Sequence, residues 1–151
     1  MYNLGILYES NPAGHPDHAL AEAWFRRAGD AGLREAEFSL AKMFRREGRF
    51  DKALETLRYS AAVGYSPSMR LLGRMHHDGQ GTSRDLAEAR RWMERASERG
   101  NVFAARLLAV WMLKGELGIL RIPLGLLIYL KSILDALVIL FISSENDVRV
   151  N

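Results

Sequence analysis

The sequence predicts an all-α fold made of stacked helix pairs, and three observations lead to it. First, a set of small and apolar residues recurs with spacings of 36, 32 and 36 residues between positions 1 and 114. Second, apolar residues within each period lie three and four positions apart, as on one face of a helix. Third, no segment alternates apolar and polar residues as a half-buried strand does. Self-similarity at this period is typical of an array in which each repeat packs on the next.

Each repeat is predicted to be an antiparallel helix pair, and its first helix carries a leucine followed by glycine or alanine. These dipeptides are Leu4-Gly5, Leu40-Ala41, Leu72-Gly73 and Leu108-Ala109. The small residue lets a neighbouring helix approach closely. The position three residues after it holds a larger side chain, in order Tyr8, Phe44, His76 and Met112. Because Met1 comes only three residues before the first leucine, we expect the first helix to lack its opening turn.

The second helix of each pair is expected to run from an alanine to a glycine eleven residues later. The end residues are Ala21 and Gly32, Ala53 and Gly64, and Ala89 and Gly100. We expect each glycine to take the left-handed conformation that closes a helix. Asp85 followed by Glu88 predicts a capping box at the start of the last of these helices.

The composition changes after the repeats, where we expect a linker over 115–123, a hydrophobic helix over 124–142 and a polar tail over 143–151. This helix would be apolar on nearly every side, with Lys131 and Asp135 as its central charges. Summed insertion energies make a single membrane span marginal. We therefore expect the helix to associate with a membrane by spanning it or lying on it, with burial between copies of the chain as the alternative.

The distribution of charge predicts an orientation for such an anchor. Basic residues precede the hydrophobic segment and acidic residues follow it, which would place the repeats on the cytoplasmic side of the membrane. Residues 1–30 contain no apolar run of the kind that a secretory signal requires. We thus expect a chain without a signal peptide that is held at the inner face of a membrane.

Composition limits the chemistry that the chain can perform. Its 151 residues include no cysteine, which excludes disulfides, thiolate zinc sites and cysteine nucleophiles. The formal net charge of +3 is far below that of a dedicated nucleic-acid-binding protein, although the pI is 9.4. His76 and His77 are neighbours on a helix and point in different directions, so they make a poor metal site. No recognisable nucleophile motif is present, and we expect neither an enzyme nor a cofactor.

The combined pattern resembles a known repeat. Leu-Gly-x-x-aromatic, a Gly-x-Gly loop and Ala-x-x-Trp-x-x-x-Ala-x-x-x-Gly together resemble the Sel1-like repeat, a relative of the tetratricopeptide repeat. The third unit matches best, at Leu72, Gly73, Gly79, Gly81, Asp85, Ala89, Trp92, Ala96 and Gly100. The second unit lacks a four-residue loop insertion and has Thr56 where Trp24 and Trp92 stand in the others. The resemblance implies a right-handed superhelical solenoid that serves protein–protein contact without catalysis.

Helical geometry predicts which side chains line the concave face of such an array. Residues two before the repeat leucine, and two, five and six after it, point away from the core of the first helices. The candidate partner-binding residues, here called the groove residues, are Phe38, Lys42, Arg45, Arg46, Arg70, Arg74, His77 and Arg106. Stacked helices lie about 10 Å apart, comparable to the Debye length, so the fields of these mostly basic side chains add.

These features together predict a non-catalytic scaffold or adaptor. Its groove would bind another protein through an acidic or phosphorylated peptide or a carboxylate terminus. An ordinary solvated, arginine-rich face is the alternative meaning of the same pattern. The second functional hypothesis is an RNA-binding accessory protein using the same groove, which the scarcity of aromatic residues there disfavours. Homo-oligomerisation through the hydrophobic helix is also open.

Overall fold

In the computed structural model, residues 1–11, 14–118 and 122–148 are described, and the side chains of Ala136 and of residues 139–148 are not. All regular structure within these ranges is helical, which confirms the all-α class. The helices are α1 (Tyr2–Ser10), α2 (His18–Asp30), α3 (Arg34–Arg46), α4 (Phe50–Ala62), α5 (Ser66–Asp78), α6 (Leu86–Glu98), α7 (Val102–Leu113) and α8 (Ile122–Val148).

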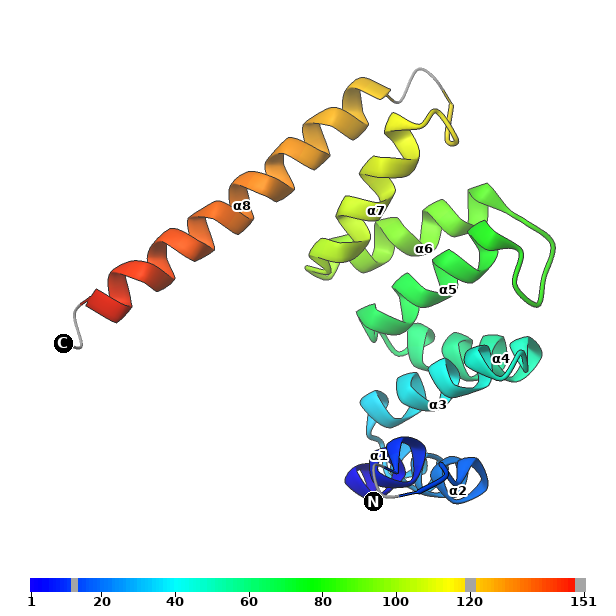
Figure 1. Ribbon diagram of the computed structural model, residues 1–151. Helices are drawn as coiled ribbons and strands as arrows, with labels where there is room; N and C mark the ends of the chain where they lie inside the picture. The colour runs from blue at the N-terminus through cyan, green and yellow to red at the C-terminus, as the bar shows by residue number, and fades with distance from the viewer. Residues whose placement is uncertain (12–13, 119–121, 149–151) are drawn as a thin grey trace.

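The helices form a solenoid in which each one packs on its neighbours in the sequence (Figure 1). Three pairs, α1–α2, α3–α4 and α5–α6, are followed by α7, against which α8 packs. Helix α1 has nine residues, whereas α3 and α5 have 13. The α3–α4 connection is Glu47–Arg49 and the α5–α6 connection is Gly79–Asp85, so the second repeat is the one with the shorter loop.

Small residues permit the close contact between the two helices of a pair, as predicted. A Cβ atom at Gly73 would lie 3.0 Å from the carbonyl oxygen of Ala89 and 3.2 Å from the Cγ of Met93, both on α6. At Gly5 it would lie 2.6 Å from the ring of Phe25 on α2. Both distances are shorter than an ordinary contact, so a side chain at either position would push the helices apart.

The other residues of the leucine dipeptides lie in the core, with one exception. The buried ones are Leu40, Ala41, Leu72, Leu108 and Ala109. Leu4 instead is 38% exposed, because it lies on the outermost helix of the stack (Figure 1).

The three repeat glycines end their helices as predicted. The φ angles of Gly32, Gly64 and Gly100 are +92°, +97° and +79°. At Gly32, its own N–H and that of the next residue donate to carbonyl oxygens three and five positions earlier, at 2.8 and 3.0 Å. The same two hydrogen bonds recur at the other two glycines. This double hydrogen bond is the Schellman motif, and glycine takes its left-handed position without steric cost.

The predicted capping box at the start of α6 is only half formed. Asp85 Oδ1 accepts hydrogen bonds from the N–H groups of Ala87 and Glu88, at 3.0 and 2.9 Å. The prediction is wrong for the second hydrogen bond of a capping box, which the Asp85 N–H would donate to the side chain of Glu88. Its carboxylate accepts instead from Arg91 at 3.0 Å, and the Asp85 N–H donates to the His76 carbonyl at 2.9 Å. The loop therefore satisfies the donor that the capping box would have used.

Helix α8 is longer than the 124–142 expected, since it includes the end of the expected linker and most of the polar tail. It meets α7 closely at Gly125, where a Cβ atom would lie 2.6 Å from that of Met112. Its other side exposes a row of apolar residues that includes Leu127, Leu134 and Val138. In the part of the chain that the structure describes, no helix is long and apolar enough to cross a membrane. The structure does not describe the side chains of residues 139–151, which include the end of the expected hydrophobic helix and the polar tail. Membrane association therefore stays a prediction.

Candidate functional site

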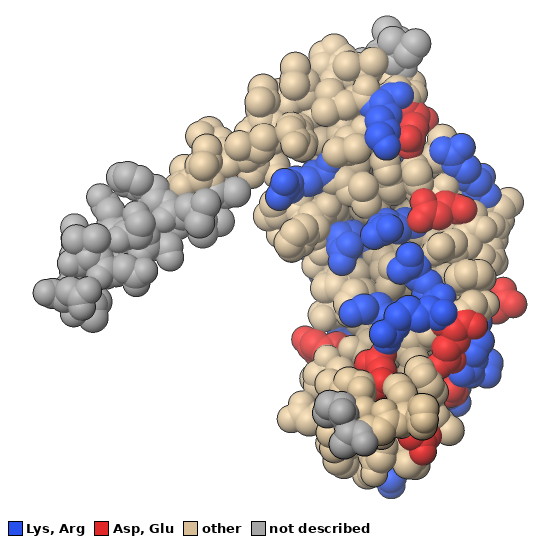
Figure 2. All heavy atoms as spheres, viewed as in Figure 1, with Lys and Arg blue, Asp and Glu red and all other residues tan. Residues whose placement is uncertain are grey.

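All eight groove residues lie on the first helices of successive pairs. Phe38, Lys42, Arg45 and Arg46 are on α3, Arg70, Arg74 and His77 are on α5, and Arg106 is on α7. Figure 2 shows Lys and Arg side chains gathered over the middle of the solenoid on the face in view. The contacts of the eight residues divide them into a set that joins neighbouring helices and a set of cations without an anionic partner.

Three groove residues on α3 join neighbouring segments. Phe38 packs edge-on against Tyr65, which precedes α5, with ring centroids 6.0 Å apart. Arg45 Nε donates to Gln80 Oε1 at 2.8 Å, in the loop that follows α5. Arg46 forms an ion pair with Glu9 on α1. These side chains therefore link the first helices of successive repeats, and their polar groups are already engaged.

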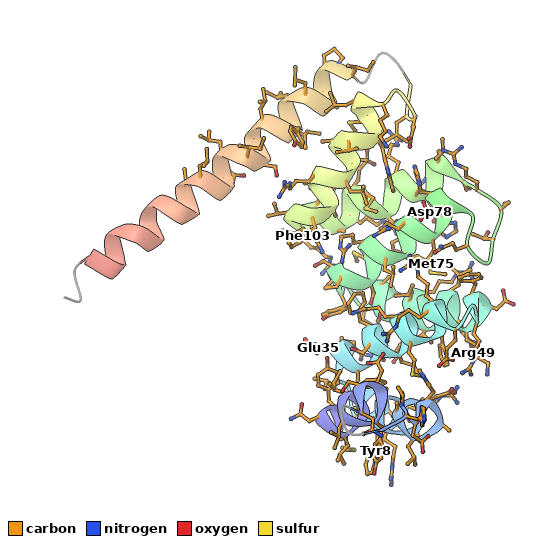
Figure 3. The ribbon with its side chains drawn as sticks, viewed as in Figure 1. Tyr8, Glu35, Arg49, Met75, Asp78 and Phe103 are labelled. Carbon is orange, nitrogen blue, oxygen red and sulfur yellow. The ribbon has the colours of Figure 1, made fainter. Side chains whose placement is uncertain are left out.

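His77 connects α5 to α7. Its ring stacks on Trp111, with centroids 4.0 Å apart and planes 4° from parallel. Nδ1 lies 2.7 Å from Asp78 Oδ1, and Nε2 lies 2.6 Å from Glu116 Oε2. Asp78 is at the C-terminal end of α5, as Figure 3 shows. The ring is thus held between two carboxylates and an indole, as part of the scaffold.

The preceding histidine is enclosed by α5 and its neighbours. His76 is buried, and this burial lowers its pKa. The neighbouring carboxylates Glu88 and Asp85 oppose that effect, while the charge of Arg58 adds to it. Among the described residues, no three His, Asp or Glu side chains come together as metal ligands would.

The four remaining groove residues are cations. Lys42, Arg70, Arg74 and Arg106 have no carboxylate within 4.0 Å in the described structure. We call these four the unpaired cations. Lys42 Nζ lies 5.6 Å from the centre of the Phe38 ring, a weak cation–π contact.

Arg70 is the most constrained of the unpaired cations. Burial lowers the pKa of its guanidinium, and the charge of Arg74 lowers it further. Its Nε is buried without a hydrogen-bond acceptor among the described residues. A desolvated guanidinium with an unused donor beside a second cation is electrostatically unfavourable, and a bound anion would relieve both costs.

Sequence reasoning missed Gln80, Trp111 and Glu116. Trp111 immediately precedes the predicted core position Met112, so its neighbours in the repeat could have indicated a role. Gln80 and Glu116 lie in loops outside the repeat register, and no signal in the sequence pairs them with Arg45 or His77. These partners explain why Arg45 and His77 are structural.

Comparison with known proteins identifies the repeats. The family model of the Sel1 repeat matches residues 1–33 and 66–101, which contain the first and third predicted units. The chain is a Sel1-like repeat protein. The matched stretches of this Sel1-like protein are those that carry the tryptophans Trp24 and Trp92, and the second repeat, which has Thr56, lies between them.

Two solved structures agree with this assignment, and two curated relatives match part of the chain. The chain is 31% identical to a protective antigen of uropathogenic Escherichia coli with an SLR fold, with a TM-score of 0.65 over 76% of this chain and 25% of that one. A Sel1 repeat protein from Oxalobacter formigenes is 20% identical and has a TM-score of 0.69, with 87% of this chain and 56% of that one covered. DAP3-binding cell death enhancer 1 of mouse and of rat are 33% and 32% identical over 88 residues. This match spans 57% of the present chain and 17% of each relative.

Proposed function

We propose that this chain is a non-catalytic scaffold that binds an acidic segment of a partner protein across α3, α5 and α7. The observation that carries the proposal is the set of four unpaired cations, one or two on each of three successive first helices. On such a surface an extended acidic peptide would meet a new positive charge at every repeat, about 10 Å from the last.

The energetics require several contacts acting together. An exposed ion pair contributes only about 0.2–1 kcal/mol, and salt screens it. Arginine binds a carboxylate through two parallel N–H groups, which adds geometric selection. Arg70 has a buried, unused Nε donor, so a carboxylate there would gain more than one at a fully solvated arginine.

Two further observations favour a protein ligand over RNA. Binding of single-stranded RNA uses exposed aromatic rings as stacking platforms. In this chain Trp111 is buried and stacked on His77, and Phe38 is packed against Tyr65. In addition, the mouse and rat relatives are named for binding a protein, DAP3.

The test uses a fluorescently labelled hexaglutamate peptide and fluorescence anisotropy. The double reversal Arg70→Glu with Arg74→Glu should weaken binding at least about tenfold, because it removes two cations and adds two repelling charges. The double reversal of Arg90 and Arg91 to Glu changes the net charge by the same amount. Those two arginines are on α6, where they pair with Glu94 and Glu88, so binding should change little.

Salt provides the second readout. Raising the ionic strength from about 10 mM to about 150 mM should weaken peptide binding to the unaltered protein. Equal losses in the two double variants would show that only net charge matters and would refute the proposed surface. Tighter binding of a single-stranded RNA such as oligouridine than of the peptide would favour the RNA hypothesis instead.

A further inference from the structure

A cavity of about 690 Å³ lies between α2 and α4, with α3 as its floor. It is separate from the proposed peptide surface, because its walls come from the second helices of the first two pairs. Gly29 of α2, Glu37 of α3 and Thr56 of α4 are among the residues that line it. Its volume falls within the range of about 300–1,000 Å³ that is typical of ligand sites.

The equivalent space one repeat further along lies between α4 and α6, the second helices of the second and third pairs, and it is largely filled. The pocket between α4 and α6 has a volume of about 280 Å³ and is lined by Ala61, Met69 and Trp92. In the repeat register, Ala61 corresponds to Gly29, Met69 to Glu37 and Trp92 to Thr56. The cavity therefore arises where the chain lacks an indole ring that the third repeat supplies.

A carboxylate lies at the floor of this cavity. Glu37 is 7% exposed, and its Oε1 accepts a hydrogen bond from Arg34 Nη1 at 2.5 Å. Its Oε2 is buried and has no donor among the described residues. The glycine at position 29 makes room for it, because a Cβ there would lie 3.0 Å from the Glu37 Cγ. A buried acceptor left unsatisfied is costly, so a ligand that donates to it would be stabilised.

The charges around the cavity select a neutral ligand. Its lining includes three cationic side chains, Arg26, Arg34 and Lys52, and three acidic ones, Asp30, Glu37 and Glu55. Since these balance, neither an anion nor a cation gains a net attraction. A flat aromatic ring with one N–H donor satisfies both the shape left by the missing tryptophan and the unused acceptor.

We propose that this cavity binds the indole ring of a tryptophan side chain presented by a polypeptide, with the indole N–H donating to the Glu37 carboxylate. Trp92 shows that the repeat accommodates this ring at the equivalent place. The exposed side chain of Tyr59 lies at the edge of the cavity, with Arg34 Cζ 5.2 Å from the centre of its ring. It can contact the backbone that carries the indole.

The experiment titrates N-acetyl-tryptophanamide into the full chain and follows binding by NMR. Its matched ligand control is the same compound methylated at the indole nitrogen, which keeps the ring and removes the donor. We expect saturable binding of the first compound, and binding of the second that is at least about tenfold weaker, as for loss of one hydrogen bond to a charged acceptor.

Two variants locate the site. Thr56→Trp fills the cavity as in the third repeat and should abolish binding. Glu37→Met introduces the residue of the equivalent position and should remove the discrimination between the two compounds. Arg70→Glu, on the proposed peptide surface, should leave the binding unchanged, which keeps the two proposals separate.

Absence of saturable binding by the unaltered chain would overturn the proposal. So would binding that persists in Thr56→Trp, or a preference for the N–H compound that persists in Glu37→Met. Saturable binding of free indole without binding of N-acetyl-tryptophanamide would overturn the polypeptide source.

Discussion

The second and third repeats share their helix ends and differ in what fills the space between successive second helices. Both end α4 and α6 with the same double hydrogen bond around a left-handed glycine. Between the second helices, the third repeat has Trp92 where the second has Thr56. The difference shows that caps and small-residue contacts define a helix pair, whereas the packing between pairs tolerates large changes.

The largest effect on stability is expected from a substitution at the contact between the two helices of one pair. Gly73→Leu should lower the free energy of unfolding by about 2–4 kcal/mol, because even a Cβ there would lie 3.0 Å from a backbone carbonyl of α6. Thermal unfolding should show a fall in Tm of at least about 4 °C. Ala87→Leu, on an exposed position of α6, serves as the control and should change Tm little. Equal effects of the two substitutions would contradict the close contact.

A smaller loss should follow from making the third repeat like the second. Trp92→Thr removes a partly buried ring from between α4 and α6 and should cost about 1–3 kcal/mol. The measurement is denaturant unfolding of the full chain. If stability did not change, Trp92 would contribute nothing to the packing between repeats, and its absence from the second repeat would carry no meaning.

The smallest expected effect concerns the core position that holds Phe44 in the second repeat and His76 in the third. Burial lowers the pKa of His76 from its ordinary value of 6.5, so the unfolded chain takes up this proton more readily than the folded one. Its contribution to stability is complete above the unfolded pKa and is lost as pH falls toward the folded pKa. His76→Phe should therefore lose less stability than the unaltered chain between about pH 7.5 and about pH 5.

Thermal melts at the two pH values measure this difference. The other histidines are present in both proteins, so their contributions cancel. A pH dependence that is identical in the two chains would mean that His76 is as accessible to protons in the folded state as in the unfolded one.

Most of the fold was predictable because its determinants are local and repeated. Glycines at one repeat position predicted the helix ends, and glycine in the leucine dipeptide predicted the tight contact at Gly73. The prediction of a hydrogen bond from the Asp85 N–H to the Glu88 side chain was wrong, because the backbone carbonyl of His76 accepts from the same N–H group. That competition depends on the path of the loop, which a capping pattern does not contain.

The candidate site was predictable only in part. Helical geometry placed the groove residues on the correct helices, but it could not distinguish Arg46, which pairs with Glu9, from Lys42, which pairs with no carboxylate in the described structure. The cavity at Glu37 could not be predicted from the sequence for the same reason. It needs Gly29 and Thr56 to meet Glu37, and no local rule relates positions on three different helices.

Packing of each helix mainly on its sequence neighbours has a consequence for cooperativity. In such a linear chain of interfaces, the free energy of unfolding is close to a sum of terms for each repeat and each boundary between repeats. Partial unfolding can then begin at either end of the stack and proceed inward, with the middle repeats opening last. Amide protons of α3 to α5 should consequently exchange more slowly than those of α1. A partner bound across α3, α5 and α7 would make these repeats unfold together.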